Sequence, residues 1–355
     1  PLPLLGYVVG LATAAEWAAE VVRRRTTGRV LVPTPRQCGL VAAAALAALP
    51  LATLPTLVWG LGGRISTSEY PVSWYDAGRA MGDGDGAVLF LPWHAYQPFD
   101  FTLGRTVATP GDAFFGREVL SSDAVELGVV RTDSVSRRSA YVDALMAAGG
   151  RGGFSRLVAP LGVEYVFLAR GVEDARYEWL AREPGVQRVL SSDTAVLYRV
   201  ADRGTGRVVG SRAVDLTGAL ALGDRLGSEA LLPDGPTSAP VPSDRAGGLR
   251  RADVTRWELA AGEPGWVVVP EEWSAGWRLD GESGTPTVAG TVAFRAGPTA
   301  GVVEFKPWSY LRWGVLLSVL ALLTLLTVGL LEHRRDLDPR LRASGRAARS
   351  ARAGQ

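Results

Sequence analysis

The sequence is poor in the residues that most often bind metals or form disulfides. It holds one cysteine, Cys38, and two histidines, His94 and His333, among 355 residues. One cysteine forms no internal disulfide, and two histidines nearly exclude a histidine-based metal site. Lys306 is the only lysine, so the Lys-containing loop that cradles nucleotide phosphates is absent. The sequence therefore predicts no metal and no cofactor.

Short catalytic motifs are missing as well. The chain has no Gly-x-Ser-x-Gly elbow, no His-Glu-x-x-His and no Cys-x-x-Cys. A free-standing Ser-His-Asp hydrolase would need His94, and no motif around it supports that hypothesis. Several acids are candidate catalysts, although glycosidic chemistry requires a carboxylate separation that a sequence does not show. These acids are Asp76, Asp83, Asp85, Asp112, Glu118 and Asp123.

What the sequence does have is long apolar runs. Cys38–Leu61 and Trp313–Leu331 carry no charge over 24 and 19 residues, which is enough to cross a bilayer. Leu2–Val22 is a weaker candidate, because Glu16 and Glu20 interrupt it. We expect these two acids to lie at the cytoplasmic interface, although acids inside a membrane are otherwise functional candidates. The prediction is two or three membrane spans.

Charge predicts the orientation of these spans. The loop 23–36 holds five arginines and no acid, and the tail after Leu331 holds seven arginines against three acids. By the positive-inside rule both segments face the cytoplasm. The intervening residues 64–306, with 25 basic and 31 acidic side chains, then lie outside. We expect a multi-pass protein of the cell (cytoplasmic) membrane with a large outer domain and its C-terminus inside.

The basic tail is explained by this topology, or by contact with anionic membrane lipid. Nucleic acid is not an expected partner, because no aromatic residue alternates with the arginines. The predicted fold class is membrane α-helical with an extracytoplasmic α/β domain followed by a β-sandwich domain. The predicted divisions are 1–63 (two membrane helices and a basic cytoplasmic loop), 64–200 (α/β), 201–306 (β-sandwich-like), 307–332 (membrane helix) and 333–355 (basic cytoplasmic tail).

Helical and strand patterns alternate over 64–200, which indicates an α/β layer domain. The helices expected there are Val72–Met81, Ser136–Ala148 and Glu173–Arg182. The expected strands are Ala87–Leu91, Val163–Leu168, Val186–Leu190 and Ala195–Val200, the last two forming a hairpin.

Residues 201–306 have short β-type runs with recurring turn signals, which suits a β-sandwich. Residues 233–248 are rich in Gly, Pro and Ser and are interpreted as a linker or long loop. The tryptophans Trp266, Trp273 and Trp277 suit either a carbohydrate-binding face or a core, and the core is favoured. The expected strands are Arg207–Leu216, Arg256–Ala260, Gly265–Val269, Trp277–Leu279, Thr287–Arg295 and Gly301–Phe305.

The most distinctive stretch is FLPWHAYQPFDFTLGRTVAT, residues 90–109, which follows a predicted buried strand. Ligands of α/β sheets bind beyond the carboxyl ends of strands, and aromatic, acidic and basic side chains together suit a carbohydrate or a lipid phosphate. The alternative is an aromatic-rich loop that packs one domain on another. The candidate ligand-binding residues are Trp93, His94, Tyr96, Asp100 and Arg105.

Two segments carry a family resemblance. EEWSAGWRLDGE (Glu271–Glu282) and the run Gly290–Ser318, with its PWS step into the last span, resemble the carboxyl end of YfhO-like bacterial membrane proteins and related GT-C-type glycosyltransferases. GVEYVFLARG (Gly162–Gly171) is similar to their α/β portion. PVSWYDAGRAM and FLPWHAYQPFDF resemble the extracytoplasmic part of actinobacterial members. The resemblance covers roughly residues 38–331.

The resemblance implies transfer of a sugar from a polyprenyl-phosphate donor to an envelope glycan, outside the cytoplasmic membrane. It also implies a catalytic acid in the first outer loop of a protein with many more spans. The chain opens at Pro1, after that point, and no residue here matches the acid. We expect a carboxyl-terminal part that binds donor or acceptor beside a catalytic core located elsewhere, in the same polypeptide or in a protein partner. The alternative is a non-catalytic envelope scaffold or binding protein.

Overall fold

The structure, a computed structural model, describes residues 67–127, 130–150, 152–201, 204–208 and 248–329. The chain divides into two compact units, 1–69 and 70–355, and the elements below belong to the second. The predicted spans Leu2–Val22 and Cys38–Leu61, most of the loop 233–248 and the basic tail lie outside the described residues. No further division appears within 70–355, so the predicted boundary after residue 200 stays a prediction.

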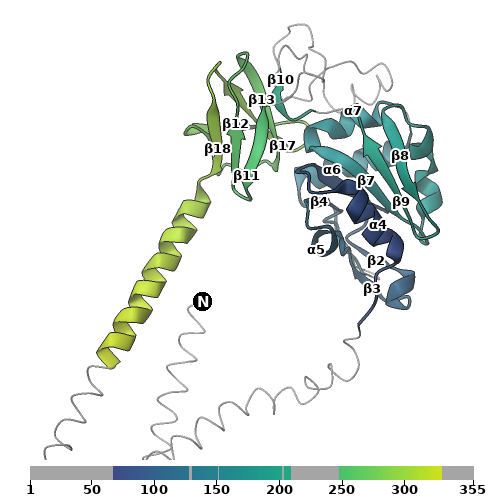
Figure 1. The fold of residues 1–355 in the computed structure, drawn as a ribbon, viewed down its shortest axis with the longest axis horizontal. Helices are drawn as coiled ribbons and strands as arrows, with labels where there is room; N and C mark the ends of the chain where they lie inside the picture. Colours follow the sequence, from purple (N-terminus) through teal and green to yellow (C-terminus); the bar gives the residue numbers. More distant parts are fainter. Residues whose placement is uncertain (1–66, 128–129, 151, 202–203, 209–247, 330–355) are drawn as a thin grey trace, which may run out of the picture. The chain divides into compact units, whose positions relative to one another are not determined.

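A five-stranded mixed sheet forms the first part of the described chain (Figure 1), in the order β4-β1-β7-β9-β8. β1 pairs in parallel with β4 and β7, whereas β9 is antiparallel to both β7 and β8. All five residues of β1 are buried, as expected of a central parallel strand covered on both faces. The strands are β1 (Ala87–Leu91), β4 (Val119–Leu120), β7 (Val163–Ala169), β8 (Val186–Ser191) and β9 (Ala195–Val200).

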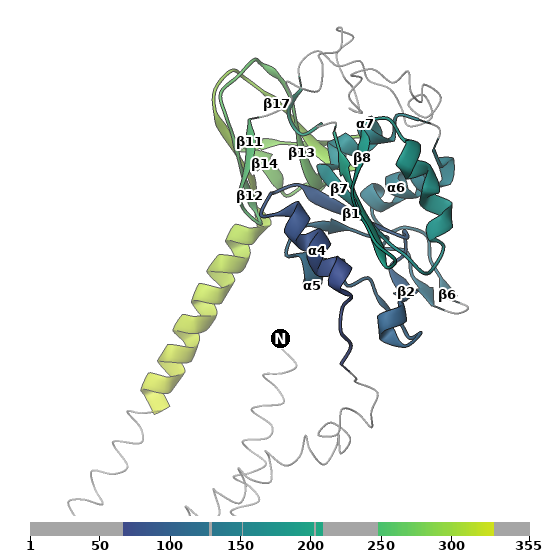
Figure 2. The same cartoon turned by 45° about the vertical axis from the view of Figure 1, so that its right-hand side comes forward.

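Helices cover both faces of this sheet (Figure 2). Leu89 and Leu91 of β1 face the helices α6 and α7, while Val88 and Phe90 face α4 and α5, because successive strand residues point to opposite sides. Among the described residues, Trp74 of α4 is the largest fully buried side chain. The helices are α4 (Val72–Met81), α5 (Gly111–Phe115), α6 (Arg137–Ala148) and α7 (Phe154–Val158), with the 3₁₀ helices η2 (Asp100–Thr102), η3 (Ala159–Leu161) and η4 (Asp174–Arg182).

The predicted helix Val72–Met81 and strand Ala87–Leu91 are confirmed to the residue. Ser136 is the N-cap of α6, where its side chain accepts a hydrogen bond from the Ser139 amide at 3.0 Å. The helix predicted over Glu173–Arg182 is present over Asp174–Arg182, as the 3₁₀ helix η4. In a 3₁₀ helix, side chains three residues apart share one face, and this places both Tyr177 and Leu180 in the core.

Two further sheets pack through a shared cluster of buried side chains that includes Trp257, Val269 and Phe294. One sheet has the order β10-β13-β17-β16, from β10 (Gly206–Val208), β13 (Gly265–Glu272), β17 (Thr291–Ala296) and β16 (Thr285–Pro286). The other has the order β11-β12-β18-β14-β15, from β11 (Leu249–Asp253), β12 (Arg256–Leu259), β18 (Gly301–Phe305), β14 (Trp277–Leu279) and β15 (Glu282–Ser283).

The core interpretation of the tryptophans is confirmed for Trp266 and Trp277, which are both buried. The strand expected from Thr287 begins only at Thr291, because Thr287 and Gly290 form a tight turn that is closed by two backbone hydrogen bonds. β11 was not predicted, since its sequence, LRRAD, carries charges on both faces, as an edge strand tolerates.

Arg207 joins the ends of several strands. It is buried, and its guanidinium donates hydrogen bonds of 2.6–3.0 Å to four backbone carbonyls. A rigid fork of N–H donors suits such a cluster of acceptors. The acceptors are Ala260, Glu263, Gly297 and Thr299.

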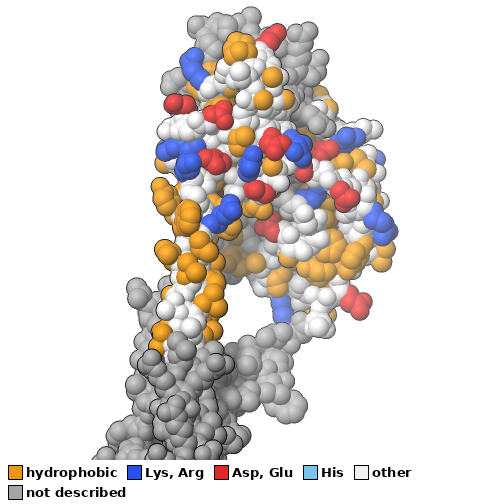
Figure 3. Space-filling model, turned by 60° about the vertical axis from the view of Figure 1, so that its left-hand side comes forward, with side chains coloured by type: hydrophobic (Ala, Val, Ile, Leu, Met, Phe, Trp, Pro, Cys, Tyr) orange, Lys and Arg blue, Asp and Glu red, His pale blue; other side chains and the backbone are white. Residues whose placement is uncertain are grey.

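The described chain ends in one helix, Pro307–Gly329, that is long and apolar enough to cross a membrane. It has 23 residues, and its leucines and valines are exposed around its whole circumference. Figure 3 shows hydrophobic side chains along its visible face. The helix begins at Pro307, directly after Lys306, and so includes six residues before the uncharged run that starts at Trp313.

Candidate functional site

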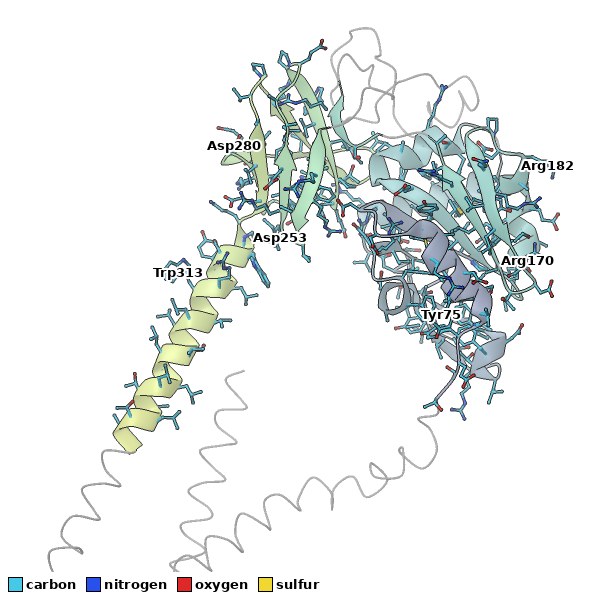
Figure 4. The ribbon with its side chains drawn as sticks, viewed as in Figure 1. Tyr75, Arg170, Arg182, Asp253, Asp280 and Trp313 are labelled. Carbon is cyan, nitrogen blue, oxygen red and sulfur yellow. The ribbon has the colours of Figure 1, made fainter. Side chains whose placement is uncertain are left out.

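The carboxyl ends of β1, β4 and β7 meet at one edge of the mixed sheet. In open α/β sheets, ligands bind beyond this edge. Trp93 and His94 follow β1, Glu126 comes after β4, and Glu173 comes after β7. Arg170, which directly follows β7, marks this edge in Figure 4.

His94 lies between two carboxylates. Its Nδ1 is 2.6 Å from Oε2 of Glu126, and its Nε2 is 3.3 Å from Oε2 of Glu173. The three side chains are 21%, 40% and 49% exposed in that order, so the cluster meets solvent. No hydrogen bond among the described residues uses the Oε1 atoms of the two glutamates. Each carboxylate therefore has an oxygen available to accept a hydrogen bond from a ligand hydroxyl.

The backbone around His94 and Glu173 holds this cluster in place. The Thr109 hydroxyl donates to the His94 carbonyl at 2.7 Å, and the Thr109 amide donates to Ala95. Glu173, the N-cap residue of η4, has a left-handed backbone conformation with φ of 54°. Arg176, one turn further on, lies 3.8 Å from the Glu173 carboxylate and adds a positive charge beside it.

Trp93, the residue before His94, is buried. Its amide donates to the Tyr177 hydroxyl at 3.0 Å, and its Nε1 donates to Oδ1 of Asp143 at 2.6 Å. Asp143 also accepts a hydrogen bond from Ser134. Burial raises the pKa of Tyr177, although the hydrogen bond from the Trp93 amide acts in the opposite direction. The structure therefore places Trp93 in the core, with its polar atoms satisfied.

The other three predicted site residues lie on or beside a hairpin of β2 (Tyr96–Pro98) and β3 (Thr106–Ala108). Tyr96 pairs with Ala108, and Arg105 immediately precedes β3 with its side chain exposed. Asp100 begins η2, and a Cβ added to Gly171 would lie 3.5 Å from its Oδ2. The structure therefore brings Asp100 to the end of β7, while Arg105 lies at the end of the hairpin away from His94.

Of the aromatic residues in the stretch 90–109, Phe99 is buried in the core and Phe101 packs against it partly buried. The rings of Phe99 and Phe101 lie 5.7 and 5.3 Å from that of Trp74, edge to face. Both rings stack on each other at 5.1 Å. These two residues support the alternative that the stretch packs structure together.

Several candidate acids have structural roles. Asp112 accepts a hydrogen bond from the Val119 amide at 3.1 Å, and burial raises its pKa. Burial would also raise the pKa of Asp123, but hydrogen bonds from Ser136, Ser139 and Val135 outweigh it and lower the pKa. Asp76 pairs with Arg79 on the exposed face of α4. In the described part of the chain, no group of three or more His, Cys, Asp or Glu side chains could hold a metal.

A second polar cluster joins α6 and the segment before β4 to the β-rich part. Glu118 lies 2.7 Å from Arg138 and 3.6 Å from Arg251, and Arg251 lies 3.3 Å from Glu271. Trp257 donates to Glu271 at 3.1 Å. Burial raises the pKa of Glu271, and the nearby Glu118 carboxylate adds to the rise, while Arg251 opposes it. These ion pairs connect α6 and the start of β4 to the strands β11 and β13.

Glu126, Glu173, Asp143 and Tyr177 were not predicted from the sequence as site residues. Glu173 had one available signal, since it follows a predicted strand by a few residues, as His94 does. Glu126 had none, because β4 before it is only two residues long and leaves no pattern.

The comparisons with known proteins found few similarities. No family model matches the chain, and no curated protein matches it. The chain is similar to part of a cryo-EM structure of the arabinofuranosyltransferase AftD from mycobacteria, with a TM-score of 0.36 and 16% identity, over 56% of this chain and 18% of that one. For a mutant form of AftD, the TM-score is 0.30 and the identity 13%, over 77% of this chain and 34% of that one. The chain thus spans less than a fifth and about a third of those two chains, and scores this low establish no common fold.

Proposed function

We propose that this chain is the carboxyl-terminal part of a GT-C-like membrane glycosyltransferase that acts in cell-envelope glycan assembly. Its outer region would hold a polyprenyl-phosphate sugar or the acceptor glycan close to a catalytic core supplied elsewhere. The observation that carries the proposal is the solvent-accessible cluster of His94, Glu126 and Glu173 at the carboxyl edge of the sheet. The resemblance of 162–171 and 271–318 to that family supports it.

The cluster suits a ligand that combines hydroxyls with an anionic group. Glu126 and Glu173 supply acceptors for sugar hydroxyls, and such charge-assisted hydrogen bonds are stronger than neutral ones. Arg170 and Arg176 supply cations at the same edge, where a phosphate would find favourable charge. No bond-forming step is assigned to these residues, because the cluster is proposed to bind and orient the ligand.

The Pro307–Gly329 helix supports a membrane location. In water, an apolar helix with exposed leucines on every side would be unfavourable, whereas a bilayer satisfies it. We place the outer region, residues 64–306, outside the cytoplasmic membrane and the C-terminus inside, since the two arginine-rich segments then face the cytoplasm.

Binding to the full chain in detergent micelles tests this proposal. The probes are polyprenyl-phosphate pentoses and hexoses and soluble fragments of envelope glycan, each titrated against labelled protein. We expect one class to bind, and the double variant E126Q/E173Q to lose most of that affinity. The matched control is E258Q. Glu258 lies on β12 and forms an exposed ion pair with Arg250 of β11. The proposal fails if neither class binds, or if the double variant and the control bind equally well.

A second candidate is a non-catalytic envelope scaffold, which the packing of Phe99 and Phe101 against Trp74 favours. A scaffold would bind no sugar probe and would retain a stable protein partner on purification from membranes. Its partner binding would be unchanged by E126Q/E173Q and by loss of the Arg105 side chain. The binding titration above therefore separates the two candidates.

A further inference from the structure

The first turn of α4 and the segment after η2 carry apolar side chains that nothing in the described chain covers. Val72 is 74% exposed, Tyr75 is 50% exposed and Leu103 is 85% exposed. Leu103 also has a left-handed backbone conformation, with φ of 54°, which turns it out of η2. Apolar side chains presented together in this way mark a contact with a partner or a membrane.

Aromatic rings connect these side chains into one surface. The ring of Tyr75 lies 5.0 Å from that of Phe114, and the Phe114 ring lies 4.5 Å from that of Tyr70. Tyr70 in turn lies 5.2 Å from Phe101, two residues before Leu103. We call this surface the α4–η2 patch, which consists of Tyr70, Val72, Tyr75, Phe101, Leu103 and Phe114.

The α4–η2 patch lies at the same edge of the sheet as His94. The Ser73 hydroxyl, between Val72 and Trp74, is 2.5 Å from that of Thr194. The Thr194 carbonyl accepts a hydrogen bond from the Arg170 amide, directly after β7. In Figure 4, Tyr75 and Arg170 lie toward one end of the sheet and Arg182 lies toward the other.

The length of chain before α4 limits what the patch can meet. The uncharged run predicted to span the membrane ends at Leu61, nine residues before Tyr70. Even a fully extended chain of that length reaches only about 30 Å. The patch is therefore tethered close to the bilayer surface if Cys38–Leu61 spans the membrane.

The residue types fit a lipid interface. Tyrosine has an apolar ring and a polar hydroxyl and is enriched where hydrocarbon meets headgroups. Val72 and Leu103 supply exposed aliphatic side chains beside it. Arg79, which pairs with Asp76, lies on the same face of α4 as Tyr75 and one turn after it along the helix.

We propose that the α4–η2 patch rests in the headgroup region of the lipid bilayer, on the outer side of the membrane. The carboxyl edge of the sheet, with His94, then faces the membrane surface. This inference rests on exposure, ring contacts and chain length, and it stands whether or not the cluster around His94 binds a sugar.

Fluorescence quenching by lipids tests the proposal on the full chain. Cys38, the only cysteine, is replaced by serine, and single cysteines are introduced as Y75C and L103C and labelled with an NBD dye. The protein is reconstituted into vesicles of phosphatidylethanolamine and phosphatidylglycerol, with or without a lipid that carries a nitroxide near its headgroup. The matched control is R182C, an exposed position at the other end of the sheet.

We expect the nitroxide lipid to quench the dye at positions 75 and 103 and to leave the dye at position 182 unchanged. A blue-shifted dye at 75 and 103 without quenching would overturn the proposal and show that protein covers the patch. An unshifted and unquenched dye would show that the patch stays in water, which would overturn it equally. A loss of sugar binding in E126Q/E173Q leaves this outcome unaffected, so the two proposals fail separately.

Discussion

Replacing Asp143 should destabilise the packing of Trp93, the residue next to His94. Asp143 accepts the Trp93 Nε1 hydrogen bond at 2.6 Å and a second one from Ser134. D143A leaves the buried indole N–H without an acceptor, and a hydrogen bond to a charged group contributes about 2 kcal/mol. D143N keeps a carbonyl oxygen for the indole, so its cost should be about 1 kcal/mol.

The expected cost follows from how tightly Trp93 is held. The side chain is only 8% exposed, so no water replaces the lost acceptor easily. For a domain of this size, about 2 kcal/mol lowers the melting temperature by roughly 4–8 °C. Y177F removes the partner of the Trp93 amide and should cost about 1–2 kcal/mol. Because both partners hold one residue, the double variant D143N/Y177F should deviate from additivity by about 0.5 kcal/mol or more.

The assay is thermal denaturation of the full chain in detergent, followed by intrinsic fluorescence and by loss of soluble protein. D133A is the matched control, since Asp133 is an exposed acid close by in the sequence, and its change should stay within about 0.5 kcal/mol. Equal melting temperatures for D143A and D143N would refute the reasoning, because the acceptor oxygen would then contribute nothing. Strict additivity in D143N/Y177F would refute the idea that the two bonds fix one side chain.

Three further predictions concern the rest of the outer region. The raised pKa of Glu271 means that the fold disfavours its charged form, so its contribution to stability is complete below the unfolded pKa and is lost as the pH rises through the folded pKa. E271Q should therefore melt at a higher temperature than the wild type at pH 7 and at the same temperature at pH 4. The opposite order of melting temperatures would contradict this. G290A should lower the free energy of unfolding by at least about 2 kcal/mol in thermal melts, because φ of Gly290 is 76° and the new Cβ would lie 2.5 Å from the Arg138 amide nitrogen. G281A, whose new Cβ would meet no atom within 4 Å, should cost about 1 kcal/mol. R207K should cost about 3 kcal/mol, because one ammonium cannot satisfy four carbonyls, and a melting temperature equal to the wild type would contradict that.

Much of the sheet and its helices could be predicted because single local patterns specify them. Ala87–Leu91 is an apolar run bounded by a turn, and Val72–Met81 has apolar residues at helical spacing, so burial and periodicity suffice. The hairpin of β8 and β9 has a short polar turn between two runs, which fixes both strands. β4 was not predicted, because a strand of two residues is too short to show an alternating pattern. It nevertheless pairs in parallel with β1 and forms the edge of the sheet.

Of the three residues in the candidate cluster, only His94 was a candidate from the sequence. His94 was found because it follows a strand, but its partners Glu126 and Glu173 are 32 and 79 residues away in the sequence. Such pairs depend on how strands are ordered in the sheet, which no local pattern encodes. Trp93, also a candidate ligand-binding residue, is buried and hydrogen-bonded to Asp143 and Tyr177. An aromatic residue next to a strand end looks the same in sequence whether it faces a ligand or the core.

The junction of β18 and the Pro307–Gly329 helix has a mechanical consequence. β18 is the central strand of its sheet, and only Lys306 separates it from the helix. The Lys306 amide donates a hydrogen bond to the Gly276 carbonyl, so this one-residue connection is itself fixed to the sheet. A helix that tilts to match a thinner bilayer would therefore transmit its tilt directly to β18. The thickness of the membrane would then affect the orientation of the β-rich part of the molecule.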